Sequence, residues 1–271
     1  MRPVRAPLAL ALALGLTLAG ASLAHSQVPG VTPAYTAAQL HCARFLETSR
    51  SEIETETSRG AVAATAERRS IWSFNAHDSS GGVALEAWFD SLTVGRRTAE
   101  GEVTADTDGL IGGRYRALLK PSGEYIELAR PFIPDEVAEL ADLSGAARDL
   151  LPPLPPGPLA PGESWKDSVL ALERGPDTIL AGRPLLHFQL TAHAESRAAV
   201  PRGDTVPIPL RQTTAEEGDV YWSPAAGLVR RTRSIIIEAT VPSGGRVRQP
   251  ARSRVVQRIE LTRLPARRPC G

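Results

Sequence analysis

The sequence predicts a mainly β protein of the α+β class. We expect a curved antiparallel sheet, arranged as a half-barrel or a sandwich, with a short N-terminal helix and a central helix. From about residue 50 onward the chain alternates polar and apolar residues in long runs, and Gly-rich and Pro-rich turn signals separate these runs. Strands of this kind place one face on a core and the other in water, which favours an antiparallel sheet over a parallel α/β fold.

Residues 1–24 have the layout of a secretory signal peptide, because Arg2 and Arg5 precede an apolar run that ends at Ala24. Small residues predict cleavage before His25, and cleavage before Gln27 fits nearly as well. An uncleaved anchor is the alternative, since the run is almost long enough to span a bilayer. Residues 25–34 are expected to form a flexible leader. No later run is long enough for a membrane helix, so we expect a periplasmic or secreted chain without a transmembrane segment after signal cleavage.

The charge balance is close to neutral. Removal of residues 1–24 takes away two of the 31 basic residues and none of the 30 acidic ones, which leaves a net charge of −1. Because phosphate binding needs a basic surplus, we expect no nucleic-acid partner. Arginines cluster at residues 230–233 and 246–254. We interpret them as solvated faces of long strands, and a local basic patch is the alternative.

Residues 35–150 are expected to form an N-terminal β-rich half with flanking helices. An amphipathic helix is predicted in residues 36–49 and a second over 135–151, with a potential break at Ser144 and Gly145. Between them the alternation predicts strands over residues 50–59, 61–77 and 83–94, followed by a hairpin of residues 109–119 and 123–128. In the strand over 83–94 the apolar face carries Val83, Leu85, Ala87 and Phe89.

The Pro-rich segment over residues 151–163 is interpreted as an extended spacer between two halves, because proline stops the preceding helix. A polyproline-II ligand is the alternative. Residues 164–271 are expected to form a C-terminal β-rich half that packs with the first as one unit. Its predicted strands cover residues 164–174, 178–195, 214–223, 227–241 and 254–264.

Two cysteines, Cys42 and Cys270, lie near the two ends of the mature chain. In an oxidising compartment such a pair predicts a disulfide bond. Two unrelated free thiols are the alternative.

Motifs for chemistry are weak. Gly162–Lys166 lacks the second glycine of a nucleophile elbow. His187 and His193 are six residues apart, which in a regular strand is about 20 Å and too far for one metal ion. Asp106–Gly109 only begins a calcium loop. We therefore expect no catalytic residue, no metal site and no cofactor.

Four tryptophans, each on a predicted strand, are the candidate ligand contacts. They either pack in the core or line a cavity between the curved sheet and the helices, where apolar ligands are usually held. The four are Trp72, Trp88, Trp165 and Trp222.

Three short motifs carry a resemblance to known proteins. Pro161–Trp165, preceded by FDSLTV at residues 89–94 and DTDGLIGG at residues 106–113, resembles a group of uncharacterised, secreted, β-rich bacterial proteins. The layout of helix, curved sheet and late strands is also similar to the periplasmic lipoprotein-carrier fold. That resemblance implies a half-barrel that holds acyl chains.

These observations lead to a functional hypothesis. We expect a non-enzymatic exported binding or carrier protein with an apolar cavity for a lipid-like, hydrophobic ligand. The alternative is a structural or protein-interaction module of the cell envelope, with an envelope protein as partner. A third hypothesis is an enzyme whose dispersed site carries no sequence motif.

Overall fold

The computed structural model describes residues 30–57, 60–180, 182–202, 205–241 and 251–267. In this part the body of the protein is one antiparallel sheet of 13 strands. The strands are β1 (Arg44–Thr57), β2 (Gly60–Ser79), β3 (Gly82–Thr98), β4 (Gly101–Thr104), β5 (Tyr115–Leu119), β6 (Tyr125–Ala129), β7 (Ser164–Lys166), β8 (Leu170–Arg174), β9 (Thr178–Leu180), β10 (Arg183–Arg202), β11 (Thr205–Ser223), β12 (Gly227–Val241) and β13 (Ala251–Leu264).

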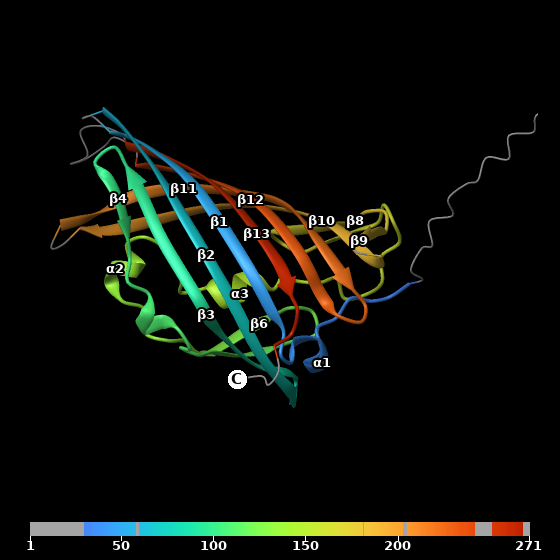
Figure 1. Cartoon of the computed structure of the whole chain (residues 1–271). Coiled ribbons are helices and arrows are strands. Elements are labelled where there is room, and N and C mark those ends of the chain that lie inside the picture. Colours follow the sequence, from blue (N-terminus) through green and yellow to red (C-terminus); the bar gives the residue numbers. More distant parts are fainter. Residues whose placement is uncertain (1–29, 58–59, 181, 203–204, 242–250, 268–271) are drawn as a thin grey trace, which may run out of the picture.

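The main path of the sheet runs β6-β5-β3-β2-β1-β13-β12-β11-β10-β8-β7, with β4 paired to β3 and β9 paired to β10. The first long strand pairs with the last, from Arg44 opposite Leu264 to Glu56 opposite Arg252. One sheet therefore includes strands from both halves of the chain. Its edges, β6 and β7, do not pair in the described part of the chain, so the sheet is open. Figure 1 shows its curvature, which confirms the predicted curved antiparallel sheet.

The predicted N-terminal helix is present but shorter than residues 36–49, in which the sequence predicts it. Helix α1 covers only Ala37–Leu40, with a capping box between Thr36 and Gln39. The helical path ends at His41, whose ψ of 123° is extended, and Cys42 follows in a left-handed conformation with φ of 56°. Strand β1 begins at Arg44, so the expectation of a helix toward residue 49 is wrong beyond Leu40. The pairing of residues 44–49 with both β2 and β13 overrides their local helical spacing.

The central helix is divided in two, as the Ser144–Gly145 signal predicted. Helix α2 covers Asp135–Ala138 and α3 covers Ala146–Leu150. Between them the carboxylate of Asp142 accepts hydrogen bonds from the backbone N and the hydroxyl of Ser144, at 2.9 and 2.6 Å. This local turn competes with helix continuation. The one other helix of the described residues is the 3-10 turn η1 (Asp108–Leu110).

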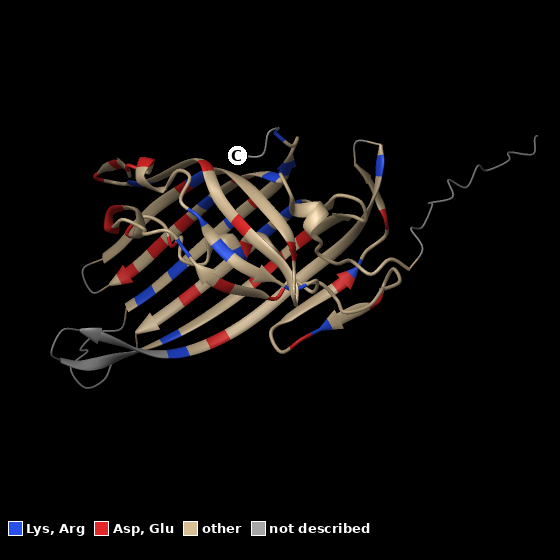
Figure 2. Ribbon diagram, turned by 90° about the horizontal axis from the view of Figure 1, so that it is seen from below, with Lys and Arg blue, Asp and Glu red and all other residues tan. Residues whose placement is uncertain are grey.

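The two faces of the sheet differ in chemistry. We call the face that carries Phe45, Trp72, Phe89 and Leu261 the core face, because all four side chains are buried. We call the opposite face the polar face, since the alternate residues there are mostly polar or charged. A register shift between Ile71 and Trp72 keeps the Trp72 and Phe89 rings together on the core face, with 3.9 Å between their centroids. Figure 2 shows charged residues of both signs interspersed along the strands.

Residues 130–163, which we call the strap, connect one edge of the sheet to the other. Because β6 and β7 are opposite edges, the strap has to cross the whole sheet, and it does so over the core face. Its Leu150, Leu151 and Leu154 are buried in the core. In Figure 1, α3 is seen behind β2 and β1, whereas α2 is seen to the side of β3. The Pro-rich segment, predicted as a spacer, thus also packs against the sheet.

Close backbone contacts fix the strap on the sheet. The hydroxyl of Tyr35 donates to the carbonyl of Pro152 at 2.9 Å, and Leu154 N donates to Ser122 O at 2.8 Å. Gly123, with φ of 88°, lies against the Pro152 carbonyl where a Cβ would not fit. None of the helices in the described residues is long and apolar enough to cross a membrane.

Candidate functional site: a cavity between the strap and the core face

The sheet is hollowed on both faces. The larger hollow, of about 1110 Å³, lies on the polar face, because most of the side chains that line it alternate away from the core. Its lining includes solvated ion pairs, such as that of Arg50 and Glu67, whose side chains are 59% and 68% exposed. It also includes Arg96, whose buried Nε has no hydrogen-bond partner in the described part of the chain. The smaller hollow, of about 450 Å³, lies between the strap and the core face. We call the smaller hollow the core-face cavity.

The core-face cavity has an apolar part. The volume of the cavity falls in the range of small-molecule binding sites. Strap residues cover the cavity on one side. Most of its apolar lining comes from adjacent strands whose inward side chains stand in register. The apolar residues are Ile53, Ala66, Val94, Leu140, Ala141, Leu150, Ile235, Ile237, Val255, Ile259 and Leu261.

One end of the cavity floor carries a buried carboxylate on β1. The side chain of Glu47 is 3% exposed and forms an ion pair with Arg68 of β2. Its Oε2 also accepts hydrogen bonds from the hydroxyl of Ser70, at 3.0 Å, and from Nε1 of Trp72, at 2.9 Å. Three donors from one neighbouring strand therefore hold the charged form of this carboxylate.

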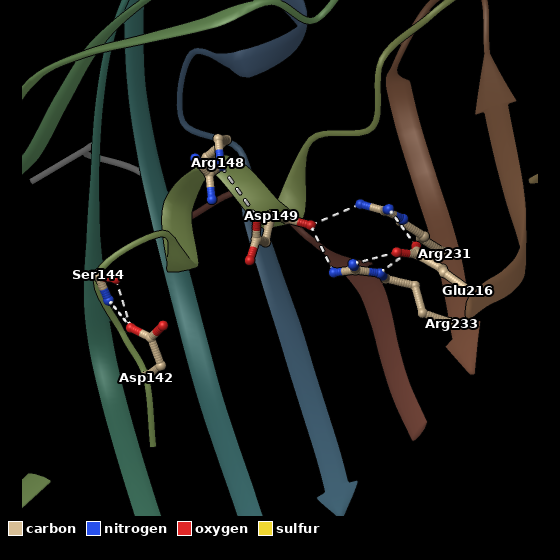
Figure 3. A network of polar contacts seen from close by, with 7 residues as sticks. All are labelled: Asp142, Ser144, Arg148, Asp149, Glu216, Arg231 and Arg233. Carbon is tan, nitrogen blue, oxygen red and sulfur yellow. Dashed lines mark hydrogen bonds and ion pairs between the residues drawn. The ribbon is translucent and has the colours of Figure 1, made fainter. Parts of the chain in front are cut away.

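A second buried ion cluster fixes the strap to the sheet, as Figure 3 shows. Glu216 of β11 accepts from Nε of Arg233 at 2.7 Å and from Nη2 of Arg231 at 3.2 Å. The same two arginines of β12 also donate to the backbone carbonyl of Asp149, at 2.7 Å from Arg231 and 3.4 Å from Arg233. This carbonyl lies in the last turn of α3, where carbonyls lack helical partners. The side chain of Asp149 points instead to Arg148.

Burial and ion pairing have opposite effects on the pKa values of the two buried glutamates. Burial raises the pKa of Glu47 and of Glu216, but the adjacent guanidiniums and the hydrogen bonds outweigh it, so both pKa values lie below the ordinary 4.5. Burial and the positive charge of Arg233 together lower the pKa of Arg231 to about 10. The floor of the cavity is therefore ionic at neutral pH.

The four predicted tryptophans are not brought together, and none of them is among the described residues that line the core-face cavity. Trp72 is fully buried beneath Glu47, and Trp222 packs edge-on to Tyr35 with ring centroids 5.0 Å apart. Trp88 is covered by the guanidinium of Arg114, 3.6 Å from the ring centroid. Trp165 is partly buried against the core. Their role as ligand contacts stays a prediction.

Other predicted sites have the following places. Residues 1–29 and Cys270 lie outside the described residues, so the signal peptide, the first half of the leader and the disulfide of Cys42 stay predictions. His187 pairs with Asp219 at 2.8 Å, and His193 lies 3.9 Å from Glu195. The described residues contain no group of three or more His, Cys, Asp or Glu placed to hold a metal ion.

Sequence reasoning missed the ionic floor. The arginines at 230–233 were interpreted as solvated, and this is correct only for Arg230, whose side chain is 39% exposed. Those of Arg231 and Arg233 are 6% and 14% exposed. A signal was present, because both share the alternation of the inward Ile235 and Ile237 and so point to the core face.

No protein family and no curated protein matches this sequence. Among solved structures, the fold is similar to that of lipovitellin, in a structure that describes its lipid–protein interactions. The TM-score is 0.51 at 8% identity, and the match covers 82% of this chain and 25% of that one. The chain thus spans about a quarter of the lipovitellin structure, and at this identity the likeness shows the fold alone.

Two further structures match at lower TM-scores. Neisserial surface protein A matches with a TM-score of 0.23 and 9% identity, over 82% of this chain and 97% of that one. An outer membrane lipoprotein-sorting protein domain from Vibrio parahaemolyticus matches with a TM-score of 0.17 and 10% identity, over 82% and 84%. TM-scores this low do not show a shared fold. The predicted resemblance to lipoprotein carriers therefore stays at the level of a curved antiparallel sheet.

Proposed function

We propose that the protein is a non-enzymatic binding or carrier protein, exported to the periplasm or beyond, that holds a lipid-like ligand in the core-face cavity. The observation that carries this proposal is a covered cavity of about 450 Å³ with aliphatic walls and an ionic floor. Such a cavity matches an amphiphile, because apolar surface gains from leaving water while a polar head needs partners. The similar fold of lipovitellin, whose structure describes lipid–protein interactions, supports it.

Native mass spectrometry of the purified, unreduced protein, with denaturation in the same run, tests the proposal. We expect a bound lipid mass that is lost on denaturation. Ile237→Asp places a charge in the apolar part of the cavity and should abolish this mass. Ile236→Asp is the matched control, since the neighbouring half-buried side chain points to the polar face. Protein that carries no lipid, and that takes up none when incubated with lipid vesicles, would refute the proposal.

A second function, as an interaction module of the cell envelope, is favoured by exposed apolar side chains on the edge strand β6 and on β9, a short strand off the main path that pairs with β10. Leu128 on β6 is 68% exposed and Ile179 on β9 is 73% exposed. Edge strands with exposed apolar residues can pair with a strand of a partner. Cross-linking in cells should then capture one envelope protein, and Leu128→Lys or Ile179→Lys should prevent the capture without removing the lipid mass.

A further inference from the structure

The buried charges on the floor of the core-face cavity do not balance. Three guanidiniums, of Arg68, Arg231 and Arg233, face two carboxylates, of Glu47 and Glu216. The cavity lining also includes acidic residues of the strap and of the polar face, but their carboxylates have other partners. Asp142 accepts hydrogen bonds from Ser144, and Asp149 and Glu67 form exposed ion pairs with Arg148 and Arg50. Among the described residues the three guanidiniums therefore share two buried carboxylates, and the exposed carboxylate of Asp149 adds an attraction to Arg231 and Arg233 from the strap.

Arg68 has the largest unused donor capacity. It donates one hydrogen bond, from Nη2 to Glu47, and its buried Nε has no acceptor among the described residues. The buried Nε of Arg231 also lacks an acceptor. Because a buried donor without an acceptor is unfavourable, a ligand that supplies an acceptor stabilises this arrangement. A guanidinium presents its donors as a planar fork, which suits a carboxylate or a phosphate oxygen pair.

The pairing register of the strands places these guanidinium groups around a space on the core face. Arg68 of β2 and Arg233 of β12 stand in one row across the core face, with Ser49 and Ile259 between them. The small side chain of Ser49 leaves space between the two long arginines. This row therefore defines a positively charged position above the centre of the sheet.

We propose that the ligand of the core-face cavity is an amphiphile with a single anionic head group, which Arg68 binds together with the Arg231–Arg233 pair. This inference rests on the proposed function. The apolar tail lies along the row of Ile53, Val255 and Ile237, four residues farther along the strands than Ser49. That distance is about 13 Å, at roughly 3.3 Å per strand residue. A long-chain fatty acid is the simplest molecule with this chemistry.

Binding of oleate and of its uncharged methyl ester to the purified protein, measured by calorimetry, tests the inference. We expect oleate to bind at least about tenfold more tightly than methyl oleate. Equal affinities would overturn the anionic head group and leave the proposed function intact. Binding of neither ligand would overturn both proposals, which makes the two failures distinguishable.

Variants locate the head group. Arg68→Met should weaken oleate binding about tenfold and leave methyl oleate unchanged, whereas Arg50→Met on the polar face should change neither. Arg68→Met leaves the Glu47 carboxylate buried without its ion partner, so we expect this variant to be less stable. The double variant Glu47→Gln/Arg68→Met removes both charges and serves as the variant that retains the fold. Its oleate affinity should match that for methyl oleate. Full retention of the oleate preference in both Arg68 variants would contradict the assignment.

Discussion

Replacement of Glu47 by leucine is the most informative perturbation of the ionic floor. The change removes the acceptor of Arg68, Ser70 and Trp72 from a position that is 3% exposed. Removal of one partner of a buried ion pair destabilises a protein by about 3–5 kcal/mol, because the other charge stays buried and unpaired. We therefore expect Glu47→Leu to lower the free energy of unfolding by about that amount.

Companion variants separate the causes. Glu47→Gln keeps an oxygen acceptor for Ser70 or Trp72 and loses the charge, so its effect should be smaller. Glu47→Leu/Arg68→Met removes both charges together, and should recover most of the loss, since a buried pair replaced by apolar residues is often nearly neutral. Glu67→Leu is the control. Its ion pair with Arg50 lies on the polar face, 68% and 59% exposed, and contributes about 0–1 kcal/mol.

The assay is urea unfolding followed by far-ultraviolet circular dichroism and tryptophan fluorescence, with the midpoint and the slope compared between variants. The reasoning is refuted if Glu47→Leu costs less than about 1 kcal/mol. It is also refuted if the double variant is as unstable as the single one, because the loss would then not arise from the unpaired arginine.

Two further predictions concern pH and backbone packing. The pKa values of Glu47 and Glu216 are lowered in the folded protein, so their stabilisation is complete above the ordinary value of 4.5 and is lost as the pH falls below it. Thermal midpoints should therefore fall steeply from pH 5 to pH 3, and less steeply in Glu47→Gln; parallel slopes would contradict this assignment. Gly218→Ala should unfold the protein or lower its stability by several kcal/mol, because a Cβ there would overlap the Thr232 carbonyl of the neighbouring strand. Gly157→Ala, with open space around it, should leave the urea midpoint nearly unchanged.

Strand patterns were predicted well where local alternation and burial agree. Val83, Leu85, Ala87 and Phe89 are all buried on the core face, as their period of two indicated. The break at Ser144 was visible because its turn chemistry is local. The N-terminal helix was overestimated because residues 44–49 receive their structure from two partner strands that are distant in sequence.

The candidate site could not be predicted from the sequence, because it depends on how the chain crosses the sheet. Glu47 and Arg68 meet across one strand pair, whereas Arg231 reaches the carbonyl of Asp149 on the strap, 82 residues earlier in the chain. Only the crossing of the strap from one edge of the sheet to the other brings these groups around one cavity. The sequence does show that Arg231 and Arg233 share a face with isoleucines, and this alternation is the signal for such a site.

Photolabelling with a diazirine-bearing fatty acid, followed by peptide mass spectrometry, tests the central claim most directly. If the ligand occupies the core-face cavity, the labelled residues should be those of its apolar part, above all Ile53, Ile237 and Leu140. Unlabelled oleate should compete for these positions. Labelling confined to the exposed apolar residues of β6 and β9, such as Leu128 and Ile179, would contradict the account.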